Sequence, residues 1–267
     1  MLVNYNIDYS QRSPRLAISV HEWHQRYLLQ TRWTRELTNY LFQKARITTS
    51  DSILEVGCGT GAVLHELVKP SLSNWLGLDI NLGYLFYARE NQPQYNFIAG
   101  DAHLLPFGDN SFDVCLCHFL LLWLTAPSIA LQEMRRVTRS GGVVMALAEP
   151  DYGGRIDYPD ELSVIGKWQT DSLLKQGADP LIGRKLRTLF AASGLNQIEA
   201  GVLGGEWKTA SPGTEQESEW AVIRSDLAQE PEKLSRLDKL YRIDQQAQEH
   251  NERILFVPTF YAWGRVP

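Results

Sequence analysis

The chain has 267 residues, of which 44% are hydrophobic and 21% charged, and its formal net charge is −5. This composition excludes collagen-like and disordered proteins, and the length is sufficient for one well-buried α/β domain. Three cysteines cannot all pair, which indicates reduced thiols, and the acidic balance favours neither nucleic acid nor an anionic membrane as a partner. No apolar run is long enough to span a bilayer and no secretory signal begins the chain, so we expect a cytoplasmic protein.

The predicted elements alternate between helix and strand. Large side chains at helical spacing predict a first helix over 20–46, and short apolar runs bounded by turn residues predict the strands that follow. The expected strands are 52–56, 75–80, 96–99, 112–118 and 142–148, and the expected helices between them are 62–69, 82–91 and 128–138. This alternation, with short connections that contain glycine, predicts a doubly wound, mostly parallel α/β sheet covered on both faces.

The pattern changes after Pro150. Residues 151–180 are predicted as a loop with a short helix, and 181–193 as a helix that ends at Gly194. Two further strands are expected over 198–203 and 257–263. The segment between them, about 207–256, predicts two amphipathic helices broken at Pro231, and we interpret it as a helical insertion that covers a sheet edge or a pocket, as a lid would.

A glycine-rich turn follows the first predicted strand. Gly57, Gly59 and Gly61 stand at alternate positions between Glu55 and the next helix. Glycine suits a sharp turn of this kind, and it lets a ligand lie against the backbone where a Cβ would block it. Gly57-x-Gly59-x-x-Ala62 also satisfies the fingerprint of dinucleotide-binding proteins, so the turn alone leaves two cofactor classes open.

Acidic residues stand at, or just after, the ends of the first three predicted strands. Asp79 stands 24 positions after Glu55 (79 − 55), and Asp101 stands 22 positions after Asp79 (101 − 79). A carboxylate at the second strand end suits the two hydroxyls of a ribose, and Asp101 with the Ala102 N–H suits an adenine ring. Because parallel strands end at one edge of the sheet, we expect the three carboxylates to converge on a single nucleoside-containing ligand.

Five successive motifs carry a family resemblance. They are Glu55-Val-Gly-Cys-Gly-Thr-Gly61, Gly77-Leu-Asp-Ile80, Gly100-Asp-Ala-His-Leu-Leu-Pro-Phe107, Ser111-Phe-Asp-Val114 and Arg135-Arg-Val-Thr-Arg-Ser-Gly-Gly142. In this order they resemble class I S-adenosylmethionine-dependent methyltransferases, and are most similar to the ubiquinone/menaquinone-biosynthesis-type small-molecule branch. The resemblance implies a seven-stranded sheet with an antiparallel last strand. It divides the chain into an N-terminal helical cap, 1–48, and a Rossmann-like methyltransferase domain, 49–267, that contains the insertion.

The resemblance implies S-adenosyl-L-methionine as the cofactor and assigns its contacts. The glycine loop, Cys58 included, would border the methionine and ribose, Glu55 would lie under the methionyl amino group, and Asp79 would hold the ribose hydroxyls. The adenine would meet Asp101 and Ala102, between Ile80 and Leu104. From the residues themselves, the stretch 25–34 is placed across the cofactor, with Arg32 or Trp33 closing its methionyl end, although a plain surface helix is equally compatible with the pattern.

Methyl transfer needs alignment of the acceptor more than a catalytic group, so the sequence carries no obligatory catalytic signature. His118, at the fourth strand end, is the candidate general base, with a structural histidine as the alternative. Tyr152, Arg155 and Tyr158 are the candidate substrate residues after the fifth strand, and Trp207 is a candidate stacking residue for a planar acceptor. His21 and His24 lack further ligands nearby, so no metal site is predicted.

The leading hypothesis is therefore an S-adenosylmethionine-dependent methyltransferase that acts on a small molecule by in-line displacement. An NAD-type oxidoreductase is the first alternative, because the loop and Asp79 also suit a dinucleotide, but no Tyr-x-x-x-Lys pair follows the fourth strand. A methyltransferase-like protein that binds the cofactor without catalysis is the second. Methylation of nucleic acid or protein is disfavoured by the lack of a basic stripe.

Overall fold

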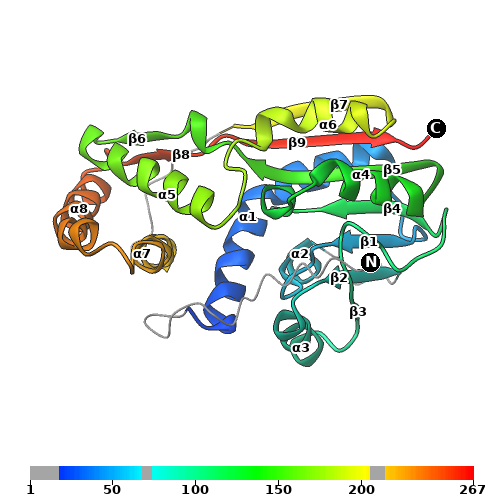
Figure 1. Ribbon diagram of the computed structural model, residues 1–267, viewed down its shortest axis with the longest axis horizontal. Helices are drawn as coiled ribbons and strands as arrows, with labels where there is room; N and C mark the ends of the chain where they lie inside the picture. The colour runs from blue at the N-terminus through cyan, green and yellow to red at the C-terminus, as the bar shows by residue number, and fades with distance from the viewer. Residues whose placement is uncertain (1–17, 68–73, 205–213) are drawn as a thin grey trace.

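The computed structural model describes residues 18–67, 74–204 and 214–267, and its centre is a seven-stranded sheet (Figure 1). The strand order is β3-β2-β1-β4-β5-β9-β7, and β9 runs antiparallel to both of its neighbours. The predicted fold class, a mostly parallel sheet with an antiparallel last strand, is confirmed. The strands are β1 (Ile53–Val56), β2 (Trp75–Asp79), β3 (Asn96–Ala99), β4 (Phe112–Cys117), β5 (Thr138–Pro150), β7 (Asn196–Leu203) and β9 (Thr259–Arg265).

Helices cover both faces of this sheet and enclose a separate apolar core on each. Helices α1 (Val20–Ala45), α2 (Ala62–Leu67) and α3 (Leu82–Asn91) pack over one core, which contains Leu41, Leu64 and Leu85. Helices α4 (Pro127–Val137) and α6 (Leu186–Ala192) pack over the other, which contains Met134 and Phe190. Burial on both faces explains why the central strands are continuously apolar in sequence.

Local sequence signals fix several helix ends. Ser19 and Glu22 form a reciprocal capping box at the start of α1, and that helix ends at Arg46, whose φ is 60°. The Asn81 side chain accepts a hydrogen bond from the Tyr84 N–H and so caps α3, while proline begins α4. These ends lie within one or two residues of the positions predicted from the sequence.

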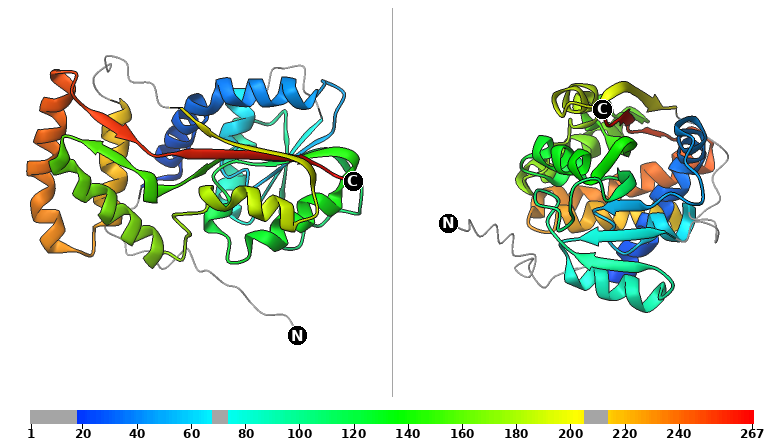
Figure 2. Two further views of the ribbon diagram at one scale, coloured as in Figure 1. Left: turned by 90° about the horizontal axis from the view of Figure 1, so that it is seen from above. Right: turned by 90° about the vertical axis from the view of Figure 1, so that its right-hand side faces the viewer.

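A second cluster of elements lies beyond the end toward which β5 runs (Figures 1 and 2). Strands β6 (Ile156–Tyr158) and β8 (Ile254–Phe256) pair antiparallel there. Helices α5 (Ser163–Lys175), α7 (Thr214–Asp226) and α8 (Pro231–Glu249) enclose a third apolar core, which includes Trp168, Trp220 and Leu237. The expected helical insertion is present as α7 and α8, which are separated just before Pro231.

Three predictions about the second half of the chain were wrong in detail. Residues 151–180 are not mainly loop, because they hold the 3₁₀ turns η3 (Tyr152–Gly154) and η4 (Asp160–Leu162), strand β6 and the 13-residue α5. The helix expected over 181–193 begins only at Leu186, after the 3₁₀ turn η5 (Gly183–Lys185). Strands β6 and β8 were missed, because three residues carry too little periodicity to indicate a strand.

No helix among the described residues is long and apolar enough to cross a bilayer.

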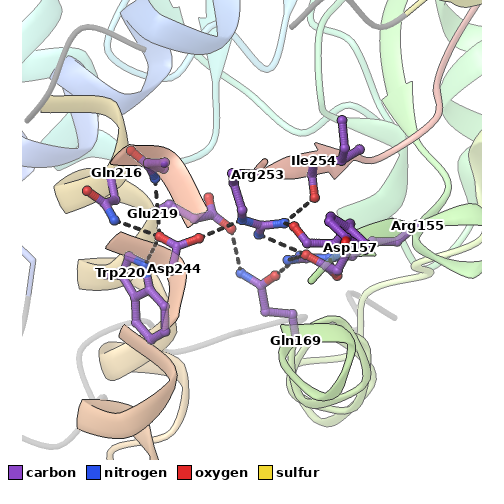
Figure 3. Close-up of polar contacts among 11 residues, drawn as sticks. Arg155, Asp157, Gln169, Gln216, Glu219, Trp220, Asp244, Arg253 and Ile254 are labelled. Atoms are coloured by element: carbon purple, nitrogen blue, oxygen red, sulfur yellow. Dashed lines mark hydrogen bonds and ion pairs between the residues drawn. The ribbon is translucent and has the colours of Figure 1, made fainter. Parts of the chain in front are cut away.

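A buried carboxylate holds the insertion together. Asp244 in α8 is 3% exposed, and its Oδ1 accepts from Arg253 Nε at 2.5 Å. Its Oδ2 accepts from Gln216 at 2.7 Å, Trp220 Nε1 at 2.9 Å and Gln248 at 3.2 Å (Figure 3). The negative charge is thus met by four donors from α7, α8 and the approach to β8.

We predict that Asp244→Asn lowers the free energy of unfolding by about 3–5 kcal/mol. It removes one of the two carboxylates that pair with the buried Arg253, the other being Asp157, and it turns an amide N–H₂ toward donors. Urea unfolding followed by circular dichroism measures the change. The matched control is Asp238→Asn, an exposed position on the same helix, where a change within about 0.5 kcal/mol is expected. Equal effects of the two substitutions would contradict this account of Asp244.

Candidate cofactor and active site

The loop between β1 and α2 adopts a backbone that only glycine takes without strain at three positions. The φ angles of Gly57, Gly59 and Gly61 are 75°, 53° and 77°. A Cβ at Gly57 would lie 2.6 Å from Leu120, whereas a Cβ at Gly59 would meet nothing closer than the ring of Tyr27 at 3.9 Å. The backbone at Gly59 therefore borders space in which a ligand can lie.

Several N–H groups of this loop are already engaged. Gly57 and Cys58 both donate to the Leu78 carbonyl, at 2.7 and 3.0 Å, and Gly59 donates to Asp79 Oδ2 at 2.7 Å. A dinucleotide places its pyrophosphate on free N–H groups at this turn. Because three of them donate to the protein itself, the loop suits a ligand without a phosphate at this turn better than a dinucleotide.

Asp79 stands at the end of β2 and ties that end to the loop. One oxygen accepts from Gly59 and the other from the Asn81 N–H at 2.8 Å. A carboxylate has about four acceptor positions, so each oxygen retains one for a ligand hydroxyl. Burial raises the pKa of Asp79, and these backbone N–H groups oppose the rise. Its position fits the predicted role at a ribose.

Asp101 lies at the same edge of the sheet, beyond β3. The Gly100 N–H donates to the Asp79 carbonyl at 3.0 Å, which brings the two strand ends together. Asp101 Oδ1 accepts from the backbone and the ring of His103, at 2.9 and 2.8 Å, and its side chain remains 44% exposed. The next residue, Ala102, is buried. A half-exposed carboxylate here can accept from an amino group of a ligand.

Large apolar side chains are exposed beside these acids. Ile80 is 61% exposed and Leu104 is 75% exposed. Exposed aliphatic side chains of this size beside two carboxylates are suited to the two faces of a heteroaromatic ring. The structure thus brings Asp79, Ile80 and Asp101 to one edge, as predicted for the adenosine part of the cofactor.

Glu55 has a different environment from the other two acids. It lies inside β1, opposite Gly77 and Leu116, and is 1% exposed. Trp75 Nε1 donates to its Oε2 at 3.3 Å, and burial raises the pKa of Glu55 to about 8. The carboxyl group therefore lies beneath the loop and carries its proton at neutral pH. Its predicted contact with a methionyl amino group stays a prediction.

His118 follows β4 and contacts helix α1. Its Nε2 lies 3.0 Å from Thr34 Oγ1, and that hydroxyl has the Thr31 carbonyl as its own acceptor at 3.1 Å. The same hydroxyl lies 3.3 Å from the Gln30 carbonyl. When it donates to either carbonyl, the histidine donates from Nε2–H and Nδ1 is left as the acceptor. Burial lowers the pKa of His118 to about 3, so the ring is neutral and a weak base at neutral pH.

Helix α1 reaches over the glycine loop with Tyr27, from the predicted stretch 25–34, and with His24 just before that stretch. His24 Nδ1 lies 2.9 Å from Thr60 Oγ1, and the Tyr27 ring is the nearest group to Gly59. Of the two predicted residues, Arg32 pairs with Glu66 of α2 at 2.8 Å and Trp33 is 48% exposed, and their contact with the methionyl end stays a prediction. The buried positions of α1, which are His24, Leu28, Thr31, Thr34 and Thr38, define its inner face.

Three candidate substrate residues fall in the described part of the second cluster. Tyr152 and Arg155 line a cavity of about 390 Å³ between η3, β6 and one face of α5, together with Asp157 and Thr170. Arg155 donates to Asp157 through Nε at 2.6 Å and is largely buried. Tyr158 is half exposed and is not among the lining residues. Trp207 lies outside the residues that the structure describes.

A further positioning residue is Glu149 at the end of β5, which is fully buried. Its two oxygens accept from the N–H groups of Leu120, Leu121 and Leu122, at 2.9, 2.8 and 3.3 Å. These bonds hold the 3₁₀ turn η2 (Leu121–Trp123), so that Leu120 packs against Gly57. The signal for Glu149 in the sequence is an acid directly after the apolar run that forms the second half of β5.

In the described ranges no group of three or more histidine, cysteine or acidic residues is arranged to hold a metal ion.

Comparisons with known proteins agree with this geometry. Residues 54–146 match a family model described as a methyltransferase domain. This segment is similar to methyltransferase domains. The comparisons support the leading hypothesis and give no support to an oxidoreductase.

Two curated relatives are similar to part of this chain. A demethylmenaquinone methyltransferase of Renibacterium salmoninarum is 41% identical over 38% of this chain and 43% of its own length. A malonyl-[acyl-carrier protein] O-methyltransferase of Erwinia pyrifoliae is 36% identical over 42% of each chain. The chain thus spans less than half the length of these relatives. Their names specify two different acceptors, so the similarity does not extend to a common acceptor.

The fold as a whole is also known. A solved structure from Thermotoga maritima, entitled a SAM-dependent methyltransferase and possible histamine N-methyltransferase, superposes with a TM-score of 0.53 and covers 93% of this chain and 98% of its own. Its sequence identity is 17%, so the likeness concerns the fold. The name of that structure describes an enzyme that depends on S-adenosylmethionine. The open backbone at Gly59, the two free acceptor positions of Asp79 and the exposed Ile80 and Leu104 fit an adenosyl group without phosphates.

The raised pKa of Glu55 predicts a pH dependence of stability. Between the ordinary pKa of 4.5 and about 8 the folded state holds a proton that the unfolded state has lost, so the free energy of unfolding falls as pH rises through this range. From pH 6.5 to 8.0 the wild type should lose about 1–2 kcal/mol more than Glu55→Gln, which keeps the acceptor for Trp75 but does not titrate. Urea unfolding at the two pH values measures this; identical pH slopes would contradict it.

Proposed function

We propose that the protein transfers a methyl group from S-adenosyl-L-methionine to a small-molecule acceptor. The observation that carries this proposal is the hydrogen bond between Asp79 and the glycine loop. The remaining acceptor capacity of this carboxylate suits the two hydroxyls of a ribose, while the engaged loop N–H groups are closed to phosphate. The methyltransferase domain model over 54–146 supports the same cofactor.

The bound cofactor would supply an electrophilic methyl group, and the chain would supply alignment. Asp79 and Asp101 would fix the adenosine, and the backbone at Gly59 would border the methionine part. The neutral ring of His118, held by Thr34, offers Nδ1 as an acceptor that can orient an incoming hydroxyl or amine. At a pKa of about 3 it is better suited to this positioning role than to removing a proton.

The acceptor would lie between helix α1 and the segment 152–170. Tyr152 borders the cavity and is influenced electrostatically by Arg26 of α1, which indicates that the cavity adjoins the helix that covers the loop. Its lining pairs a buried arginine with a buried aspartate, so the cavity carries balanced charge. A volume of about 390 Å³ is within the range of small-molecule sites and is much smaller than a nucleic-acid or protein interface.

The division into a helical cap, 1–48, and a methyltransferase domain, 49–267, remains part of this proposal. Under it α1 serves as the wall between the cofactor and the acceptor, and the insertion closes the acceptor side. The related demethylmenaquinone and malonyl-[acyl-carrier protein] methyltransferases make a quinol ring and a carboxylate the first acceptors to test.

Binding of S-adenosylhomocysteine tests the cofactor assignment. Calorimetry should show that the wild type binds it and does not bind NAD(H), and that Asp79→Ala weakens the affinity by about 1–3 kcal/mol, or about 5-fold to 150-fold, because two charge-assisted hydrogen bonds are lost. The control is Asp109→Ala, an exposed acid before the amino end of β4, which should leave affinity unchanged. Binding of NAD(H) alone would overturn the assignment.

The catalytic part of the proposal is tested by release of S-adenosylhomocysteine in the presence of acceptors. A panel of quinols, phenols, amines and carboxylates is incubated with the wild type and the methyl donor. Turnover with one class identifies the acceptor atom. Tight cofactor binding with no turnover across the panel would favour the non-catalytic alternative.

A further inference from the structure

The first half of helix α1 is held between two parts of the molecule. On one side His24 contacts Thr60 of the glycine loop and Tyr27 approaches Gly59. On the other side Arg26 Nη2 donates to Glu219 Oε2 of α7 at 2.5 Å. The helix that covers the predicted cofactor site is therefore fastened directly to the helical insertion, although the two segments are 193 positions apart in the chain.

Glu219 is the junction of this attachment. Besides Arg26, its carboxylate accepts from Gln169 Nε2 of α5 at 3.1 Å. Arg26 and Arg155 together lower the pKa of Glu219 to about 2 against the effect of burial. Glu219 is thus fully charged at neutral pH and a poor proton acceptor, which is the behaviour of an anchoring group and not of a general base.

From Glu219 the polar contacts continue through the insertion (Figure 3). Gln169 accepts from Arg155, which pairs with Asp157 at 2.6 Å, and Asp157 accepts from Arg253 at 2.9 Å. Arg253 then reaches Asp244 at 2.5 Å. We call this set the ionic chain; its members are Arg26, Glu219, Gln169, Arg155, Asp157, Arg253 and Asp244.

The ionic chain contains three arginines and three acids, so its formal charge is zero. Its charged side chains are between 2% and 18% exposed. A buried pair of this kind contributes little net stability, but removing one partner leaves an uncompensated charge that must move toward water. Disturbance at Glu219 would therefore shift its direct partner on α1.

We propose that Arg26 and Glu219 are positioning residues for the cofactor. Their ion pair fixes the first half of α1 over the glycine loop, so the insertion contributes to cofactor affinity without touching the cofactor. This inference rests on the proposed function, since the ligand whose affinity changes is the one that Asp79 and Asp101 hold.

A double-mutant cycle tests the ion pair. Arg26→Gln and Glu219→Gln are each expected to weaken S-adenosylhomocysteine binding by about 5-fold to 150-fold, because each leaves one buried charge unpaired. The double variant has no unpaired charge, so it should bind no more weakly than either single variant. Calorimetry gives the affinities, and hydrogen exchange of the ligand-free proteins should show lost protection over 20–34 in the single variants only.

The matched control lies at the other end of the same helix. Lys44 pairs with Glu199 of β7 at 2.5 Å, and both side chains are about one-third exposed. Lys44→Gln should leave both the affinity and the exchange of residues 20–34 unchanged. Loss of affinity in this variant equal to that of Arg26→Gln would show a general loosening of α1 and overturn the role of Glu219.

Two further results would overturn the proposal while the wild type still binds S-adenosylhomocysteine. One is unchanged affinity in both single variants, with only the melting temperature lowered, since the contacts of Arg32, Arg35 and Thr34 would then suffice to place α1. The other is a double variant whose loss equals the product of the single losses. Failure of the wild type to bind the ligand would instead refute the proposed function.

Glu219→Asp and Arg26→Lys extend the test if a glutamine variant does not fold. Both keep the charges and shorten the reach of one side chain. The shortened pairs should reduce affinity by a smaller factor than the glutamine variants, with the folded state retained, and the exchange of residues 20–34 should rise in the same order. Wild-type affinity together with wild-type exchange in both variants would count against the proposal.

Discussion

The candidate site depends on one hydrogen bond, from the Gly59 N–H to the Asp79 carboxylate. It joins the turn after β1 to the end of β2, and the second oxygen joins that point to the start of α3 through Asn81. Three consequences follow from this constraint. The glycine backbone stays in its positive-φ conformation, a loop N–H is closed to phosphate, and, in the proposed function, the remaining acceptor positions of Asp79 take the ligand hydroxyls.

Much of the fold could be predicted because its signals are local. Apolar runs such as 53–56 and 112–117 form strands because both of their faces are covered, and turn residues mark their ends. Asp79 and Asp101 could be assigned to one edge because parallel strands end together. The three-residue strands β6 and β8 could not be predicted, because their pairing joins residues nearly 100 positions apart in the chain. The 3₁₀ turns could not be predicted either, since three residues carry too little periodicity.

In the candidate site, the sequence predicts the surroundings of a side chain only where its position along a strand decides which way that side chain faces. Glu55, like Asp79, was predicted at the end of a strand. However, β1 continues through Val56, so the Glu55 side chain is buried against the sheet and meets Trp75 instead of solvent. Along α1, the residue types of Arg32 and Trp33 suggested a cofactor contact, while the helical period placed His24 and Tyr27 at the loop. The ionic chain has no local signal, because its members come from different elements of the fold.

The most direct measurement is a crystal structure of the protein with S-adenosylhomocysteine. We predict that both ribose hydroxyls lie within hydrogen-bond distance of the Asp79 carboxylate. The Gly59 N–H should still donate to that carboxylate, and the adenine should lie between Ile80 and Leu104. A nucleoside bound elsewhere, or an Asp79 side chain that has turned away from Gly59 to meet it, would contradict the central claim.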